Sequence, residues 1–144
     1  MFVKLIRYQD FDGTEKTAEC RFHLSKAELM KLNFRYGDVA RKMEELEARK
    51  DNEAIFAMVE DVILTAYGEK VTLPDGREVF LKDELRRQAF QSSEAFSELV
   101  MEMATRKEAV AEFVSGVVPG AMVQAIRENP EYRKLIGESE TPTG

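Results

Sequence analysis

The sequence predicts an α+β fold, with an N-terminal β-hairpin followed by a mainly helical domain that contains a minor second hairpin or loop. Three observations predict it. Apolar and polar residues alternate near the N-terminus, whereas apolar residues recur every three or four positions over most of the remaining chain. The turn tripeptide Pro74-Asp75-Gly76 interrupts the helical pattern between two short β-favouring runs. The 144 residues suffice for one domain, expected at residues 1–136, and the polar residues 137–144 are expected to form a disordered tail.

The N-terminal hairpin is expected at about residues 2–24. Residues 2–8 are apolar or β-favouring with charges interleaved, and Asp12-Gly13 supplies a turn. In the second strand the apolar side chains alternate with polar ones, so they share one face. They are Ala18, Cys20, Phe22 and Leu24. The sequence therefore predicts a hairpin with one buried face.

The helical part is expected at about residues 26–136, and the N-caps predict its first three helices. Ser25 and Glu28 have the spacing of a capping box at the point where the alternation stops. Asp38 can cap a second helix with a narrow apolar stripe, and Asp51 a third helix with a broad one. Gly68 follows the third helix as a candidate C′ residue.

The turn tripeptide predicts either a small second hairpin or an ordered loop within residues 69–82. Helical periodicity resumes after it. Thr105 and Glu108 have the spacing of a second capping box, which predicts the start of another helix. Helices are expected at residues 83–90, 94–104, 107–118, 121–127 and 131–136.

Composition and motifs exclude several classes of function. The chain has one cysteine, Cys20, and one histidine, His23, so zinc sites with four Cys and His ligands are unavailable. His23 is the only candidate base for a hydrolytic triad, and it lies on the opposite face of its strand from Cys20. The glycines are scattered singly and form no phosphate-binding loop. We therefore expect a protein that is not an enzyme and has no catalytic residues, metal or cofactor.

Charge and hydropathy indicate where the chain acts. The formal net charge is −6 and the pI is near 5.0, which gives no general attraction to nucleic acid or to an anionic membrane. No apolar run approaches the roughly 18 residues of a transmembrane helix. Lys4 and Arg7 interrupt the opening residues, which argues against a signal peptide. We expect an intracellular protein that binds neither nucleic acid nor membrane.

Large apolar side chains are frequent in the second half of the chain, and most of them fit the core positions of short helices. Met101 lies off the apolar stripe of its helix, and residues 117–123 are apolar on every side. Two interpretations stay open for this run: a partner covers it, or it is a final turn buried in the helical bundle. The candidate protein-binding residues are Phe90, Phe96, Met101, Val117, Val118, Met122 and Val123.

Four segments, in this order, resemble the tail assembly chaperones of long, non-contractile-tailed bacteriophages. They are residues 22–29 (FHLSKAEL), 63–70 (ILTAYGEK), 90–99 (FQSSEAFSEL) and 113–119 (FVSGVVP). The resemblance covers about residues 2–119, and its specificity comes from the order of the segments, since none of them is a catalytic motif.

The resemblance implies a protein that binds the tape measure protein, keeps it soluble and recruits tail tube (major tail) subunits during tail morphogenesis. Such a protein acts in the cytoplasm of the bacterial host and is absent from the mature virion. The first alternative is a structural virion protein, a small tail or head-tail connector subunit. The second alternative is a small enzyme. The sequence leaves open self-association and a frameshifted longer form that contacts the tube protein.

Overall fold

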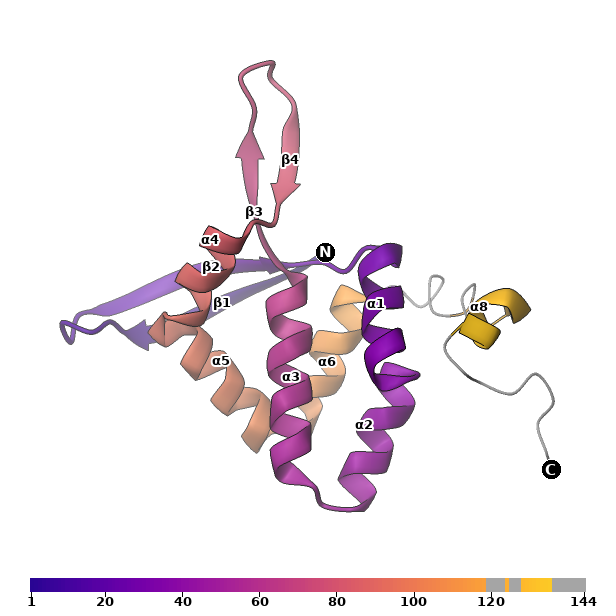
Figure 1. The fold of residues 1–144 in the computed structure, drawn as a ribbon. Coiled ribbons are helices and arrows are strands. Elements are labelled where there is room, and N and C mark those ends of the chain that lie inside the picture. Colours follow the sequence, from indigo (N-terminus) through magenta and orange to yellow (C-terminus); the bar gives the residue numbers. More distant parts are fainter. Residues whose placement is uncertain (119–123, 125–127, 136–144) are drawn as a thin grey trace.

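A computed structural model describes residues 1–118, 124 and 128–135 (Figure 1). It confirms the α+β fold and the N-terminal hairpin. Strands β1 (Phe2–Gln9) and β2 (Glu15–Phe22) pair antiparallel along their full length. The predicted inner face of β2 is correct, because Cys20 and Phe22 are buried while the alternating residues Glu19 and Arg21 are more exposed.

The turn tripeptide forms a second hairpin, so the hairpin alternative is confirmed over the loop. Its strands are β3 (Tyr67–Thr72) and β4 (Glu78–Leu81), and Gly76 in the turn has φ 90°. The sheet order is β1-β2-β3-β4, but β2 and β3 are joined through two residue pairs only, Arg21 with Gly68 and Phe22 with Tyr67. The two hairpins therefore project from the helices as separate ribbons (Figure 1).

The described helices begin largely at the predicted caps. Ser25 Oγ accepts from the Glu28 N–H at 3.1 Å, and the Glu28 carboxylate accepts from the Ser25 N–H at 2.9 Å. Asp38 and Asp51 cap the next two helices through their carboxylates. The helices are α1 (Lys26–Tyr36), α2 (Val39–Ala48), α3 (Asn52–Ala66), α4 (Glu84–Gln91), α5 (Glu94–Thr105), α6 (Lys107–Val117) and α8 (Pro130–Leu135).

The prediction that Gly68 follows the third helix at C′ is correct in position, but Gly68 lies in a strand and does not have the positive φ of a left-handed cap. Helix α3 ends at Ala66, and its C-cap Tyr67 is already extended because it begins β3. Gly68 is needed for a close approach between the two strands instead. A Cβ at this position would lie 2.6 Å from Phe80 Cε2 and 3.1 Å from the Leu81 carbonyl oxygen.

The prediction of a second capping box at Thr105 and Glu108 is wrong. The Thr105 hydroxyl donates to the Met101 carbonyl at 2.8 Å, so it belongs to the last turn of α5. The N-cap of α6 is Arg106, which makes no side-chain capping hydrogen bond. Helix α6 thus begins without the side-chain acceptor that the spacing of Thr105 and Glu108 suggests.

Two sequence predictions fall outside the described residues. They are the helix at residues 121–127, apart from Gln124, and the tail at residues 137–144. The single-domain boundary at residue 136 stays a prediction for the same reason. The last short helix is described as α8, which agrees with the expected helix at 131–136 to within one residue at each end.

The core lies where the N-terminal hairpin meets the helices. Phe22 is fully buried, and its ring packs edge-on against Phe113 of α6 at 5.1 Å and Phe90 of α4 at 5.9 Å between centroids. Helix α6 approaches β1 so closely that a Cβ on Gly116 would lie 2.4 Å from Phe2 Cδ2. This contact fixes one side of α6 on the hairpin and leaves another side free to line the site described next.

Candidate binding groove

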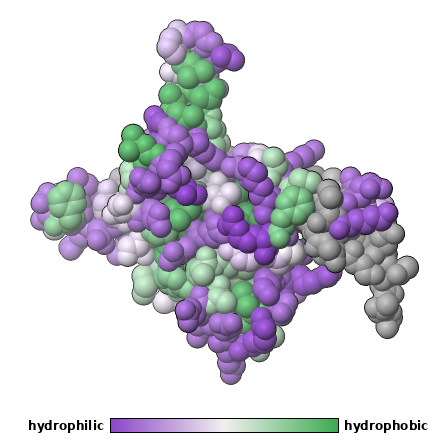
Figure 2. Space-filling view, in the orientation of Figure 1, coloured by the Kyte–Doolittle hydropathy of each residue, from purple (hydrophilic) through white to green (hydrophobic). Residues whose placement is uncertain are grey.

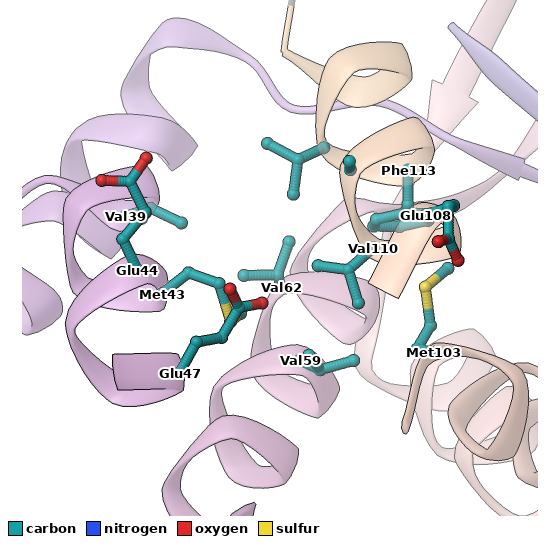
Figure 3. A pocket seen from close by; sticks show the side chains of 12 residues that line it. Val39, Met43, Glu44, Glu47, Val59, Val62, Met103, Glu108, Val110 and Phe113 are labelled. Carbon is teal, nitrogen blue, oxygen red and sulfur yellow. The ribbon is translucent and has the colours of Figure 1, made fainter. Parts of the chain in front are cut away.

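An apolar groove of about 450 Å³ lies among α2, α3, α5 and α6 (Figure 3). Val59 and Val62 of α3 lie between Met43 on the α2 wall and Val110 on the α6 wall. Met103 of α5 closes one end of the apolar lining in this view. The volume falls in the range of pockets that accept small ligands or the anchoring side chains of a partner.

The groove exists because packing within the chain buries the apolar stripes of α2 and α6 only in part. Leu46 of α2 is buried, whereas Met43 one turn earlier is half-buried and lines the groove. On α6, Phe113 points into the aromatic core, but Val110 and Val114 are half-buried in the groove wall. These half-buried side chains form apolar surface that a partner can still reach.

Three carboxylates are the charged groups of the groove lining among the described residues. Glu44 and Glu47 come from α2, and Glu108 comes from the first turn of α6. Figure 3 shows that they lie on both walls, around the apolar side chains. None of the three forms an ion pair with a side chain in the described part of the chain. The groove therefore combines an apolar interior with an acidic rim.

The comparison with protein families decides what kind of protein carries this groove. The family model described as "Phage tail assembly chaperone" matches residues 1–143. The chain belongs to the phage tail assembly chaperone family. This confirms the resemblance of the four sequence segments, and it gives the chain a place in bacteriophage tail assembly, with protein partners. No curated protein and no solved structure matches the chain.

The structure places four of the predicted binding residues of this chaperone-family chain in the core. Phe90 stacks on Tyr67 with centroids 4.0 Å apart, and Phe96 packs edge-on against Phe90. Val117 is fully buried and Val118 is 8% exposed. For Val117 and Val118, the described structure matches the buried-turn interpretation. A direct role of these four residues in binding stays a prediction.

The remaining predicted binding residues lie elsewhere. Met101 is 53% exposed on α5, next to Leu5 of β1, which is 66% exposed. An ion pair between Lys4 and Glu102 at 2.7 Å borders this shallow surface. Met122 and Val123 lie outside the described residues.

Sequence reasoning missed the groove because each of its walls looks ordinary in isolation. The stripe of α2 is narrow and its helix is rich in charge, which is typical of a solvated helix. The stripe of α6 is typical of a core helix. The spacing on α2 is one signal of the groove. Glu44 and Glu47 lie on one side of Met43, whereas Lys42 and Arg49 lie on its other side and pair with Glu45.

Other apolar groups are exposed away from the groove. Phe11 at the turn of the first hairpin is 93% exposed, and Leu85 on α4 is 77% exposed. Figure 2 shows hydrophobic surface at the tip of the β1–β2 hairpin and along the β3–β4 hairpin. These surfaces give the molecule contact points that are separate from the groove.

The single cysteine is poorly suited to nucleophilic chemistry. Burial, together with the nearby charge of Glu69, raises the pKa of the Cys20 thiol to about 11, which keeps it protonated near neutral pH. No group of three or more His, Cys, Asp and Glu side chains arranged for a metal occurs among the described residues. Within the same residues, no helix has both the length and the apolar character that crossing a bilayer requires.

Proposed function

We propose that this member of the tail assembly chaperone family binds the tape measure protein in the host cytoplasm and keeps it soluble. It then recruits tail tube subunits and leaves before the virion matures. The observation that carries the proposal is the apolar groove among α2, α3, α5 and α6 in a chain that belongs to this family. A protein that holds an aggregation-prone client needs accessible apolar surface on a charged scaffold, and the groove meets that need.

The shape of the groove suits a helical segment of the client. A helix laid between α2 and α6 would present apolar anchors at i, i+3 or i+4 and i+7 toward Val59 and Val62. Met43 and Met103 line the groove, and methionine side chains adapt to differently shaped anchors because they are flexible and polarizable. This suits a site that accepts many segments of one long client.

Recruitment of tube subunits requires a second surface that stays free while the client is held. The exposed pair Leu5 and Met101 lies on β1 and α5, and neither residue lines the groove. We assign tube contacts, made by this chain or by a frameshifted longer form, to this surface. The assignment also keeps Met101 as a protein-binding residue.

The test is co-expression with the tape measure protein encoded by the same phage or prophage, followed by a solubility assay and co-purification. The wild-type chain should keep the client soluble and co-purify with it. Met43→Glu should remain folded, because Met43 is only half-buried, and should lose most of the capture. Leu85→Glu is the matched control: this exposed leucine on α4 lies outside the groove, so capture should be unchanged. Full capture by folded Met43→Glu would show that the groove is not the client site.

A structural virion subunit is the competing function, and one observation favours it. Strand β1 is an edge of the described sheet, and edge strands can pair between neighbouring copies in a ring. Mass spectrometry of purified particles separates the two functions. A chaperone is absent from mature particles, whereas a ring subunit is present in a fixed copy number.

A further inference from the structure

The acidic rim of the groove restricts which helices the groove can hold. We propose that the groove takes an amphipathic helix that carries lysine or arginine on both sides of its apolar stripe. This inference rests on the proposed function, because it specifies the chemistry of the client segment that the same groove would bind.

The first step is the distribution of charge around α2. Lys42 and the C-cap residue Arg49 pair with Glu45, at 3.7 Å and 3.3 Å, and Arg41, the other cation of α2, is not among the residues that line the groove. Glu44 and Glu47 line the groove and form no ion pair with the described side chains. The pairing within α2 therefore leaves its groove side with negative charge.

The second step is the opposite wall. Glu108 lies in the first turn of α6, where a carboxylate is favourable to the helix dipole. The helix dipole therefore accounts for Glu108. It does not account for Glu44 and Glu47, because both lie after the first turn of α2. Three like charges around one apolar groove repel each other, and cations from a partner would relieve that repulsion on both walls (Figure 3).

The third step compares a separate partner with a second copy of the chain. The net charge of −6 disfavours a second copy of the whole chain, because it would bring a negatively charged molecule toward the acidic rim. A lysine or arginine side chain, by contrast, can lay its aliphatic stem on the apolar lining and extend its charged end to the rim carboxylates. The rim thus selects for basic amphipathic helices and against acidic ones.

The experiment measures binding of labelled synthetic helical peptides to the full chain by fluorescence anisotropy. Three peptides share one composition of apolar residues: a lysine-flanked stripe, a glutamate-flanked stripe, and a lysine-flanked peptide with the apolar positions shuffled. The first should bind about tenfold more tightly than the second at low salt. That preference should fall to less than about twofold near 1 M salt, where the Debye length is about 3 Å. The shuffled peptide should not bind measurably.

A charge-neutral rim provides the variant test. Replacing the rim acids together, Glu44→Gln, Glu47→Gln and Glu108→Gln, should leave the lysine-flanked peptide bound but reduce its preference over the glutamate-flanked peptide to less than about twofold. The control carries the same change of net charge at exposed acids outside the groove. It combines Glu15→Gln, Glu78→Gln and Glu84→Gln and should retain the full preference.

Two outcomes overturn the proposal. Equal binding of the lysine-flanked and glutamate-flanked peptides would show that the rim does not select charge, while tape measure capture could still succeed and uphold the proposed function. If no peptide binds and Met43→Glu converts an oligomer to a monomer, the groove is an interface between copies of the chain. Charge-selective peptide binding without tape measure capture would uphold the inference and contradict the proposed function.

Discussion

Lys82, directly after β4, connects the second hairpin to the start of α1 and the end of α3. Its Nζ donates to the Glu28 carboxylate at 2.6 Å, the His23 carbonyl at 2.5 Å and the Thr65 carbonyl at 3.0 Å. Burial lowers the pKa of Lys82, although Glu28 opposes this shift. Burial would raise the pKa of Glu28, but hydrogen bonds from Lys82 and Ser25 outweigh it and lower that pKa below its ordinary value. The pair is therefore held by directed hydrogen bonds that compensate for lost hydration.

Lys82→Met should destabilise the protein by about 1–3 kcal/mol, because it leaves the Glu28 carboxylate and two carbonyls without their shared donor. Urea unfolding followed by circular dichroism measures the change. Lys70→Met is the control, since the side chain of Lys70 forms an exposed pair with Glu78 at 3.6 Å, which contributes less than about 0.5 kcal/mol. Equal decreases in the unfolding free energy of the two variants would contradict the role assigned to Lys82.

The Glu28 carboxylate should also make part of the stability pH-dependent. Its pKa is lower in the folded protein than its ordinary value of 4.5, so its contribution is fully present above that value and is lost as the pH falls through the folded pKa. Wild type should exceed Glu28→Gln in unfolding free energy by about 1–2 kcal/mol at pH 7. The difference should shrink as acid protonates Glu28. A difference that stays constant from pH 7 to pH 3 would contradict this account.

The candidate site could be predicted from the sequence only in part, and single residues show why. Met101 lies off the stripe of its own helix, which is local information, and the structure shows that it is exposed. Val118 lies in an equally apolar run but is buried, because α6 is fixed on the first hairpin, where the Leu24 N–H donates to the Val117 carbonyl at 3.3 Å. Contacts between residues so far apart in the chain leave no trace in helical periodicity.

At the scale of the elements, helix α6 begins without a side-chain capping hydrogen bond. Arg106 at its N-cap has extended backbone angles, φ −132° and ψ 109°, which suit a capping serine. Arg106→Ser should therefore stabilise the protein by about 0.5–1 kcal/mol, despite the loss of an exposed pair with Glu102. Thermal unfolding measures the gain. Ser93→Ala removes an existing cap of α5 and should cost about 1 kcal/mol in the same assay; a loss of stability in Arg106→Ser would contradict the assignment.

The elements that the sequence predicted well are those with local determinants. Ser25, Asp38 and Asp51 each cap the helix that follows them, and capping involves residues no more than three positions away. Gly68 lies at the predicted C′ position, but its place in a strand could not be predicted, because pairing with distant residues determines it. The ladder that joins Phe22 to Tyr67 was likewise beyond reach, since short-range patterns carry no information about which strands meet.

At the scale of the whole molecule, the hairpins and the groove are separate features. Figure 1 shows both hairpins projecting from a helical body. The described residues that line the groove all belong to α2, α3, α5 and α6, and none belongs to a strand. A partner in the groove and a second partner on a hairpin could therefore be bound together, as the proposed function requires.

This separation predicts that the outer part of the second hairpin can be removed without loss of client capture. The Leu73 N–H donates to the Arg77 carbonyl, so hydrogen-bonded pairs alternate from there and Val71–Val79 is one of them. Residues 72–78 can therefore be replaced by a two-residue Asn-Gly turn that closes on Val71 and Val79 and continues the ladder. The contacts of Lys82 and the packing of Phe80 over Gly68 lie at the base and remain, so the unfolding free energy should change by less than about 1 kcal/mol. Capture of the tape measure protein should equal that of wild type, because every groove residue is retained. A folded variant that no longer captures its client would instead place the client on the hairpin, and the hydrophobic surface along β3 and β4 would then be its binding site.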